Sequence, residues 1–305
     1  MSNMIGHRRF RWATRALLGA AVLLAAVPAD AGERRITLGY EAYVGGFNAL
    51  SVGLDAGLQP HGYVVDFRFS TQGAVSWLVS WTMNAFSRGA VQDLRIVPVS
   101  AGADSLWSGR KRTTRLDYRS DGSVAVEIVP PIRDADERTP VPDALKRGTV
   151  DLTSALLATL RAVGQEGRCQ RREKVFDGRR RYDMVFEDGG RGRLGADAPT
   201  VYHGPTVVCR LSLEHIAGFR KTSSGFGWAK GEEAYVHVAK IFEGSPPVPV
   251  ALEYDTGIGL LRAYLTEATF ADGERQERLA TNAAEPRPSQ ATPDDKEETG
   301  RAAAD

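Results

Sequence analysis

Cysteine and histidine are scarce in this chain of 305 residues, which has two of the first and five of the second. The sequence contains no Cys-x-x-Cys, no His-x-x-x-His and no Gly-x-Ser-x-Gly, so the common zinc and serine-hydrolase signatures are absent. Beyond the first ten residues the histidines are scattered, at His61, His203, His215 and His237. We therefore expect no catalytic residues, no cofactor and no metal site. An enzyme whose groups meet only in space stays open as a third alternative.

Long apolar runs are also missing, apart from one near the start. Residues 1–31 have a basic beginning, an apolar run over 16–27 and the small residues Ala29 and Ala31. This is the three-part pattern of a cleaved secretory signal peptide, and we expect cleavage before Gly32. A retained anchor is the alternative, but a bilayer span needs about 20 apolar residues. We predict a periplasmic protein with no transmembrane segment after cleavage.

No single sign of charge dominates, because 39 Lys and Arg stand against 38 Asp and Glu. Without a clustered basic face, a nucleic-acid partner is not expected. Residues 272–305 are polar, contain no aromatic residue and hold nine acidic against five basic side chains. Such a segment cannot bury enough apolar surface to order itself, so we predict a disordered tail. Residues 32–271 remain as a single β-rich domain.

What the chain does contain is repeated alternation of apolar and polar side chains, the period of a half-buried strand. In residues 63–70, for example, Tyr63, Val65, Phe67 and Phe69 share one face. Sequences that favour tight hairpin turns separate several such runs: Gly45-Gly46, Asp121-Gly122 and Asp177-Gly178. The pattern predicts a mainly β fold, with an antiparallel curved sheet that forms a barrel or half-barrel to dispose of its edges.

Two segments need separate interpretation. Residues 75–83 alternate cleanly and predict a strand, although a helix would also bring Trp77 and Trp81 together. Residues 151–163 instead repeat their apolar side chains at helical spacing, and Asp151 and Gly164 are suited to begin and end a helix. Further strands are expected at 90–98, 110–120, 123–129, 168–176, 180–187, 206–214, 233–243, 248–255 and 258–269.

The two cysteines, Cys169 and Cys209, would both be oxidisable in an exported protein. We predict that they form a disulfide. The alternative is a metal site with His203 and His215, since Zn²⁺ accepts sulfur and imidazole ligands. The spacing of the four residues is not that of a known zinc motif, which favours the disulfide.

Charged residues are most concentrated around 175–183. If the three successive arginines there lay on a strand, Arg179 and Arg181 would point one way and Arg180 the other. One interpretation is an anion-binding face. The preferred one is an ion-pair site at the mouth of the barrel, with Asp177 or Asp183 as the partner.

Aromatic side chains on the predicted strands are candidates for lining a ligand cavity. These are Phe67, Phe69, Trp77 and Trp81, and the alternative for all four is ordinary core packing. A second aromatic group, Phe219, Phe226 and Trp228, lies among basic residues and predicts either contact with a membrane or partner, or packing onto the domain.

Several motifs in a fixed order resemble one family. Gly148–Leu157, Cys169, Val175–Tyr182, Cys209 and Ile216–Phe219 together resemble the bacterial envelope family known as domain of unknown function 3108. The resemblance covers most of the chain after the leader. It implies an exported β-rich domain, akin in fold to the half-barrels that carry lipoproteins and lipids. No family-wide activity supplies catalytic residues to transfer, and kinship of fold does not establish function.

These observations favour a non-catalytic periplasmic barrel-like protein that binds an apolar or amphipathic envelope molecule, such as a lipid or lipoprotein. In this hypothesis the predicted helix packs on or into the curved sheet. The alternative is an envelope scaffold with a filled barrel, whose loops or tail bind a protein partner.

Overall fold

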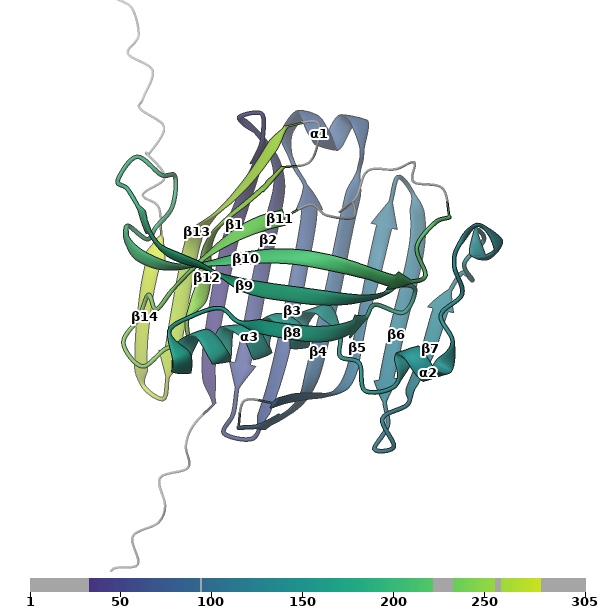
Figure 1. The fold of residues 1–305 in the computed structure, drawn as a ribbon. Coiled ribbons are helices and arrows are strands. Elements are labelled where there is room, and N and C mark those ends of the chain that lie inside the picture. Colours follow the sequence, from purple (N-terminus) through teal and green to yellow (C-terminus); the bar gives the residue numbers. More distant parts are fainter. Residues whose placement is uncertain (1–32, 94, 222–232, 256–258, 281–305) are drawn as a thin grey trace, which may run out of the picture. The chain divides into compact units, whose positions relative to one another are not determined.

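The computed structural model describes residues 33–93, 95–221, 233–255 and 259–280. All of them belong to one compact unit, residues 31–305. The described residues form a single antiparallel sheet with few helices, and the sheet is not closed into a barrel (Figure 1). The predicted fold class, a mainly β protein with a curved antiparallel sheet, is therefore confirmed, in the form of a half-barrel.

Two arms of strands make up the sheet. The strands of the first arm are β1 (Arg34–Val44), β2 (Phe47–Leu58), β3 (Gly62–Thr71), β4 (Trp81–Gln92), β5 (Arg95–Trp107), β6 (Arg110–Tyr118) and β7 (Val124–Val129). Those of the second are β8 (Arg171–Phe176), β9 (Arg181–Leu194), β10 (Gly204–Ala217), β11 (Glu233–Ala239), β12 (Val248–Asp255) and β13 (Leu260–Asp272), and β14 (Arg275–Ala280) pairs with β13. The order across the sheet is β7-β6-β5-β4-β3-β2-β1-β13-β12-β11-β10-β9-β8.

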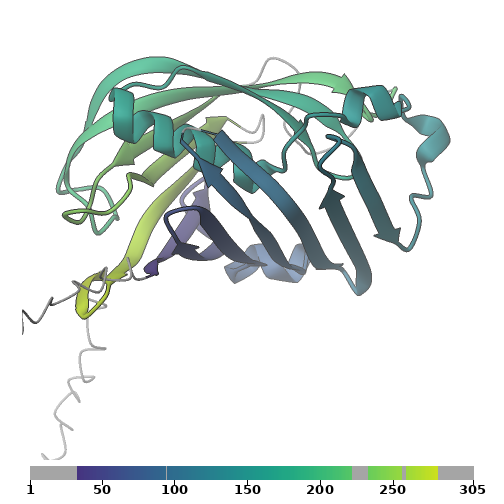
Figure 2. The same cartoon turned by 90° about the horizontal axis from the view of Figure 1, so that it is seen from below.

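The two arms meet where β1 pairs with β13. Strands of the second arm run across those of the first in Figure 1, and the arms curve toward each other in Figure 2. The helices are α1 (Gly73–Leu78), α2 (Asp143–Lys146) and α3 (Leu152–Glu166), with a 3₁₀ turn at Ala135–Glu137. Helix α3 contacts β4 and β5 of one arm and β8 of the other, so it bridges the two arms.

Alternating side chains produce the core, as predicted. In β1, Ile36 and Leu38 are buried while Arg35 and Thr37 face solvent. One apolar cluster joins β1–β3 to β12 and β13, and Phe270 is fully buried within it. A second cluster joins α3 to β8–β11. The predicted turns are also present: Gly45 and Gly46 both have positive φ, the conformation that a tight hairpin requires.

The segment 75–83 corrects the prediction of a strand. Residues 73–78 form helix α1, and β4 begins only at Trp81. The helix lies between the end of β3 and the start of β4, so its backbone bonds locally, as in the bond from Val79 N–H to Val75 O at 2.9 Å. The residues of this segment fit both an alternating and a helical pattern. They form a helix because they lie in the connection between β3 and β4, beyond the paired parts of these strands.

Other boundaries also differ. Helix α3 begins at the predicted cap, Asp151, whose side chain accepts a hydrogen bond from Ser154 N–H, but it continues past Gly164 to Glu166. Gly164 packs against Pro247, and the left-handed residue that ends the helix is Gly167, with φ of 70°. The segment 90–98, expected as one strand, contains the turn between β4 and β5.

Ordered structure also extends past residue 271. Asp272 ends β13 and β14 follows it, so the first part of the predicted tail pairs with the sheet. The rest of that tail, 281–305, and the predicted signal peptide lie outside the described residues.

Candidate ligand-binding site

An apolar cavity of about 150 Å³ lies between helix α3 and the strands β1, β2 and β3. We call it the α3 cavity. Most of its walls are aliphatic or aromatic, and they are formed by Ile36, Leu38, Tyr40, Leu54, Ala56, Leu58, Val65, Phe67, Thr153, Leu156, Leu157, Leu160, Arg161, Pro246, Pro247, Val248 and Pro249. Each strand contributes alternate residues, because only every second side chain faces the helix. The helix contributes one stripe, spaced at three and four residues.

Few polar groups reach the α3 cavity, and Tyr40 and Arg161 among them have hydrogen-bond partners. The Tyr40 hydroxyl donates a hydrogen bond to Pro249 O at 3.0 Å. Burial raises the pKa of Tyr40, so the phenol stays neutral. Arg161 donates a hydrogen bond from Nη2 to Asp93 O at 2.7 Å, so its guanidinium group is bound to a backbone carbonyl. The arrangement suits a hydrocarbon group and offers no pair of groups for acid–base chemistry.

The four aromatic residues proposed from the sequence occupy different places. Phe67 does line the α3 cavity. Phe69 and Trp81 pack against each other with ring centroids 4.3 Å apart, and Trp107 lies 5.3 Å beyond Trp81, so these form a separate aromatic row. Trp77 is 90% exposed on α1 and lines neither feature, which corrects its candidacy as a lining residue.

The prediction missed the helix side of the cavity. Leu156, Leu157 and Leu160 face it, and their stripe was visible in the sequence as ordinary helix amphipathicity. Nothing in that stripe distinguishes a side chain that lines a cavity from one that fills the core. Nothing in the sequence marked the prolines before and at the start of β12 as residues that line a cavity.

The arginine-rich segment forms ion pairs. Arg181, which is only 5% exposed, donates to Asp183 at 2.5 Å, and Arg180 pairs with Asp177 at 2.8 Å. The expected alternation over three arginines is wrong, because β9 begins only at Arg181 and the two preceding arginines belong to the turn. In that turn the Asp177 carboxylate accepts hydrogen bonds from the backbone N–H groups of Arg179 and Arg180. Of these residues, Arg179 has no ion-pair partner among the described residues.

Cys169 and Cys209 form a disulfide with Cα atoms 5.4 Å apart, as predicted. It lies in the core cluster beneath α3. His203 Nδ1 is 2.7 Å from Gly195 O, and His215 stacks on Phe219 with centroids 3.6 Å apart. Within the described ranges, no group of three or more His, Cys, Asp or Glu side chains is placed to hold a metal ion.

Phe219, from the second aromatic group, packs onto the domain, since it also contacts Tyr182 edge to face. Phe226 and Trp228 lie outside the described residues. In the part of the chain that the structure describes, no helix combines the length and the apolar character needed to cross a membrane.

Comparison with known proteins gives a matching family and a similar solved structure. The family model described as "Protein of unknown function (DUF3108)" matches residues 39–266. Among solved structures, the chain is similar to a β-barrel-like protein of domain of unknown function DUF1849 from Brucella abortus. The TM-score is 0.49 at 11% identity, over 79% of this chain and 98% of that one. No curated protein matches the sequence.

Proposed function

This chain belongs to the DUF3108 family of proteins of unknown function, and we propose that it is a non-catalytic periplasmic protein that binds an apolar or amphipathic envelope molecule in the α3 cavity. The observation that carries the proposal is the composition of that cavity. An open half-barrel whose interior is filled by side chains would have no such cavity, whereas here one of about 150 Å³ lies between α3 and the sheet.

The size of the α3 cavity indicates what enters it. An apolar cavity of roughly 150 Å³ in another protein stays dry and accepts a molecule as large as benzene. Larger ligand sites measure about 300–1,000 Å³. The α3 cavity therefore suits the end of a hydrocarbon chain, with the remainder of the molecule outside. Burial of each methylene would contribute about 0.8 kcal/mol.

Two observations support the proposed periplasmic compartment. The basic and apolar leader supports export, and a protein that keeps both of its cysteines in one disulfide suits an oxidising location. A lipid or lipoprotein is the apolar ligand that such a compartment offers.

Titration calorimetry with a series of linear alcohols from pentanol to decanol tests the binding. Affinity should rise about fourfold with each added methylene and then level off once the cavity is full. Leu160→Trp fills the cavity and should weaken binding of the longer alcohols at least tenfold. The matched control is Leu152→Trp on the same helix, because Leu152 is 46% exposed and does not line the cavity.

Organic extraction and mass spectrometry of protein purified from envelope fractions would identify the natural molecule. Absence of alcohol binding by the wild type, or equal weakening by both tryptophan substitutions, would contradict the proposal.

A second candidate function is contact with an envelope protein partner. It is favoured by an exposed apolar patch where α1 lies beside the β1–β2 hairpin: Trp77 is 90%, Leu78 85% and Phe47 71% exposed. The double substitution Trp77→Ser with Leu78→Ser should leave the unfolding curve unchanged and abolish capture of the partner from crosslinked cells. Retained capture would count against this candidate.

A further inference from the structure

A second and larger cavity, of about 630 Å³, lies where β5 ends and β6 begins. We call it the arginine cleft, because seven of its twelve lining residues are cationic: Arg110, Lys111, Arg112, Arg133, Arg138, Arg179 and Arg220. They come from β6, from the segment after β7, from the β8–β9 turn and from the residues that follow β10. Four segments that are distant in the sequence therefore bring positive charge to one place.

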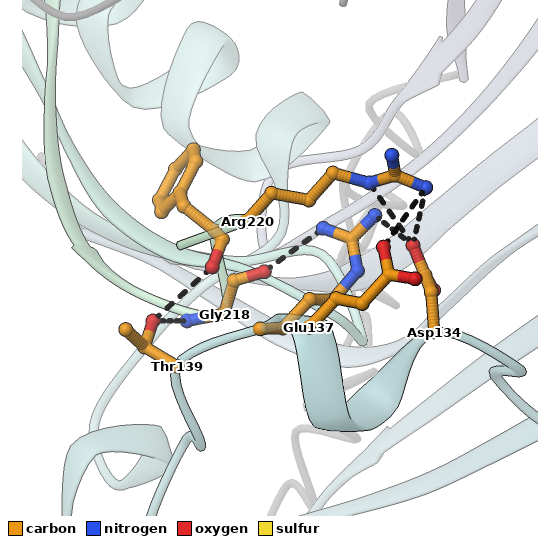
Figure 3. Close-up of polar contacts among 7 residues, drawn as sticks. Asp134, Glu137, Thr139, Gly218 and Arg220 are labelled. Atoms are coloured by element: carbon orange, nitrogen blue, oxygen red, sulfur yellow. Dashed lines mark hydrogen bonds and ion pairs between the residues drawn. The ribbon is translucent and has the colours of Figure 1, made fainter. Parts of the chain in front are cut away.

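Among the described residues, Asp134 is the one carboxylate that lines the arginine cleft, and it is already paired with two arginines. Asp134 pairs with Arg138 at 2.8 Å and with Arg220 at 2.9 Å (Figure 3). The hydrogen bond from Arg138 lowers the pKa of Asp134 to about 2, so this carboxylate stays ionised. Glu137, just outside, lies 3.8 Å from Arg220.

The other five cations of the cleft have no ion-pair partner among the described residues: Arg110, Lys111, Arg112, Arg133 and Arg179. Like charges gathered around one cleft repel each other. Two guanidinium Nε atoms, those of Arg112 and Arg138, are moreover buried without an acceptor in the described part of the chain. A buried donor without an acceptor carries a desolvation cost of about 1–3 kcal/mol. An anion in the cleft would offset the repulsion between the cations.

Backbone contacts fix one wall of the cleft in advance. Arg138 donates from Nη1 to Gly218 O at 3.1 Å, while Gly218 N–H donates to Thr139 Oγ1 at 2.9 Å (Figure 3). Thr139 N–H in turn donates to Phe219 O at 3.0 Å. The segment after β7 is thus tied to the end of β10, and Arg138 is held in place without a ligand. Such preorganisation reduces the entropy cost of binding.

The cleft also has an aromatic wall. Trp81 and Trp107 both line the cleft, and Trp107 is directly opposite Arg110 in the β5–β6 pairing. An anion held by the arginines would therefore lie beside two indole rings. A ligand that uses both walls carries an anionic group on an apolar or aromatic body.

We propose that the arginine cleft binds a phosphate group attached to an apolar or aromatic body. Phosphate is favoured because it presents several oxygens to several guanidinium forks, which can bind it through paired hydrogen bonds. The site is separate from the α3 cavity in its lining residues, so either proposal can fail alone. The phosphate could belong to a lipid headgroup or to a water-soluble organic phosphate, and the experiment has an arm for each.

Calorimetry with phenyl phosphate tests the soluble source, and sedimentation with phosphatidic acid vesicles, against phosphatidylcholine vesicles, tests the lipid source. Arg112→Gln and Arg179→Gln should each weaken binding at least tenfold. The control is Arg95→Gln, since Arg95 is exposed at the other end of β5 from Trp107 and should leave affinity unchanged. Affinity should also fall as salt rises, because the interaction is between charges.

The melting temperature provides a second readout, with and without a ligand. Because the cleft cations repel each other, Arg112→Gln and Arg179→Gln should raise the melting temperature at low salt or leave it unchanged, and phenyl phosphate should stabilise the wild type but not these variants. Binding through either source supports the proposal. It is overturned if the wild type binds neither probe, or if Arg95→Gln weakens binding as much as the cleft substitutions do.

Discussion

The hydroxyl oxygens of Tyr63 on β3 and Ser154 on α3 lie 2.7 Å apart and share a hydrogen bond within the core. Ser154 also donates to Asp151 Oδ2 at 2.5 Å, and Ser87 Oγ on β4 donates to the same carboxylate at 3.0 Å. The four side chains form a closed polar network that attaches the beginning of α3 to the first arm of the sheet. Since α3 forms one wall of the α3 cavity, this network also positions the proposed site.

Tyr63→Phe removes the phenol oxygen and keeps the ring. The hydrogen bonds to Ser154 and Ser87 are lost, so the free energy of unfolding should fall by about 1–2 kcal/mol. Urea unfolding followed by circular dichroism measures the change. Tyr235→Phe is the control, because Tyr235 is 42% exposed, and it should change stability by less than about 0.5 kcal/mol. Equal effects would show that the network adds nothing.

Asp151→Asn should alter how stability depends on pH. Burial raises the pKa of Asp151, and hydrogen bonds from Ser154 and Ser87 only partly oppose this. The unfolded chain then loses the proton at a lower pH than the folded protein does. Stability contributed by this group is therefore present below the unfolded pKa, near 3.9, and is lost as pH rises through the raised folded pKa.

Urea unfolding of both proteins at several pH values measures that effect. The stability of Asp151→Asn relative to the wild type should increase as pH rises from below 4 through the folded pKa of the carboxyl. Parallel curves for the two proteins would mean that Asp151 has the same pKa folded and unfolded.

Asp183→Asn should be among the most destabilising single substitutions in the second arm. It leaves the buried guanidinium of Arg181 without its charge partner, a change that costs about 3–5 kcal/mol when an ion pair is buried. Glu214→Gln is the matched control, because Glu214 pairs with Arg172, a neighbour of the same group, at an exposed position. That change should cost at most about 1 kcal/mol. Chemical denaturation of both variants provides the comparison.

Replacing both Cys169 and Cys209 by serine opens the loop between residues separated by 40 positions. The chain-entropy model expects a loss of about 4 kcal/mol, and less if other features restrict the unfolded chain. Thermal unfolding of the wild type with and without reductant should reproduce the difference between the wild type and the double variant. A melting temperature that ignores both treatments would contradict the prediction.

The sequence predicted local secondary structure better than it predicted which distant residues lie together. Alternation correctly placed the strands around Ile36 and Tyr63, and helical spacing placed the helix that begins after Asp151. These signals work because each depends only on near neighbours in the chain. The segment containing Trp77 fitted both periods, and only its position beyond the paired strands separates them.

The candidate sites depended on long-range geometry. Phe67 was identified as a lining residue, but Leu160 and Pro247 were not, because a side chain beside an empty space and one in a filled core have the same local pattern. The arginine cleft was missed almost entirely. Of its lining residues only Trp81 and Arg179 were named as candidates, since the other six cations come from three further segments that the sequence does not connect.

The pairing of β1 with β13 has a consequence for biosynthesis. Among the described strands β1 is synthesised first. It can pair with β13 only after nearly all of the other described strands have been synthesised. Until then the middle of the sheet has an open backbone edge that could pair with another chain. Long-range pairing of this kind is slow. We therefore expect the nascent protein to depend on a holding chaperone until its last strands emerge.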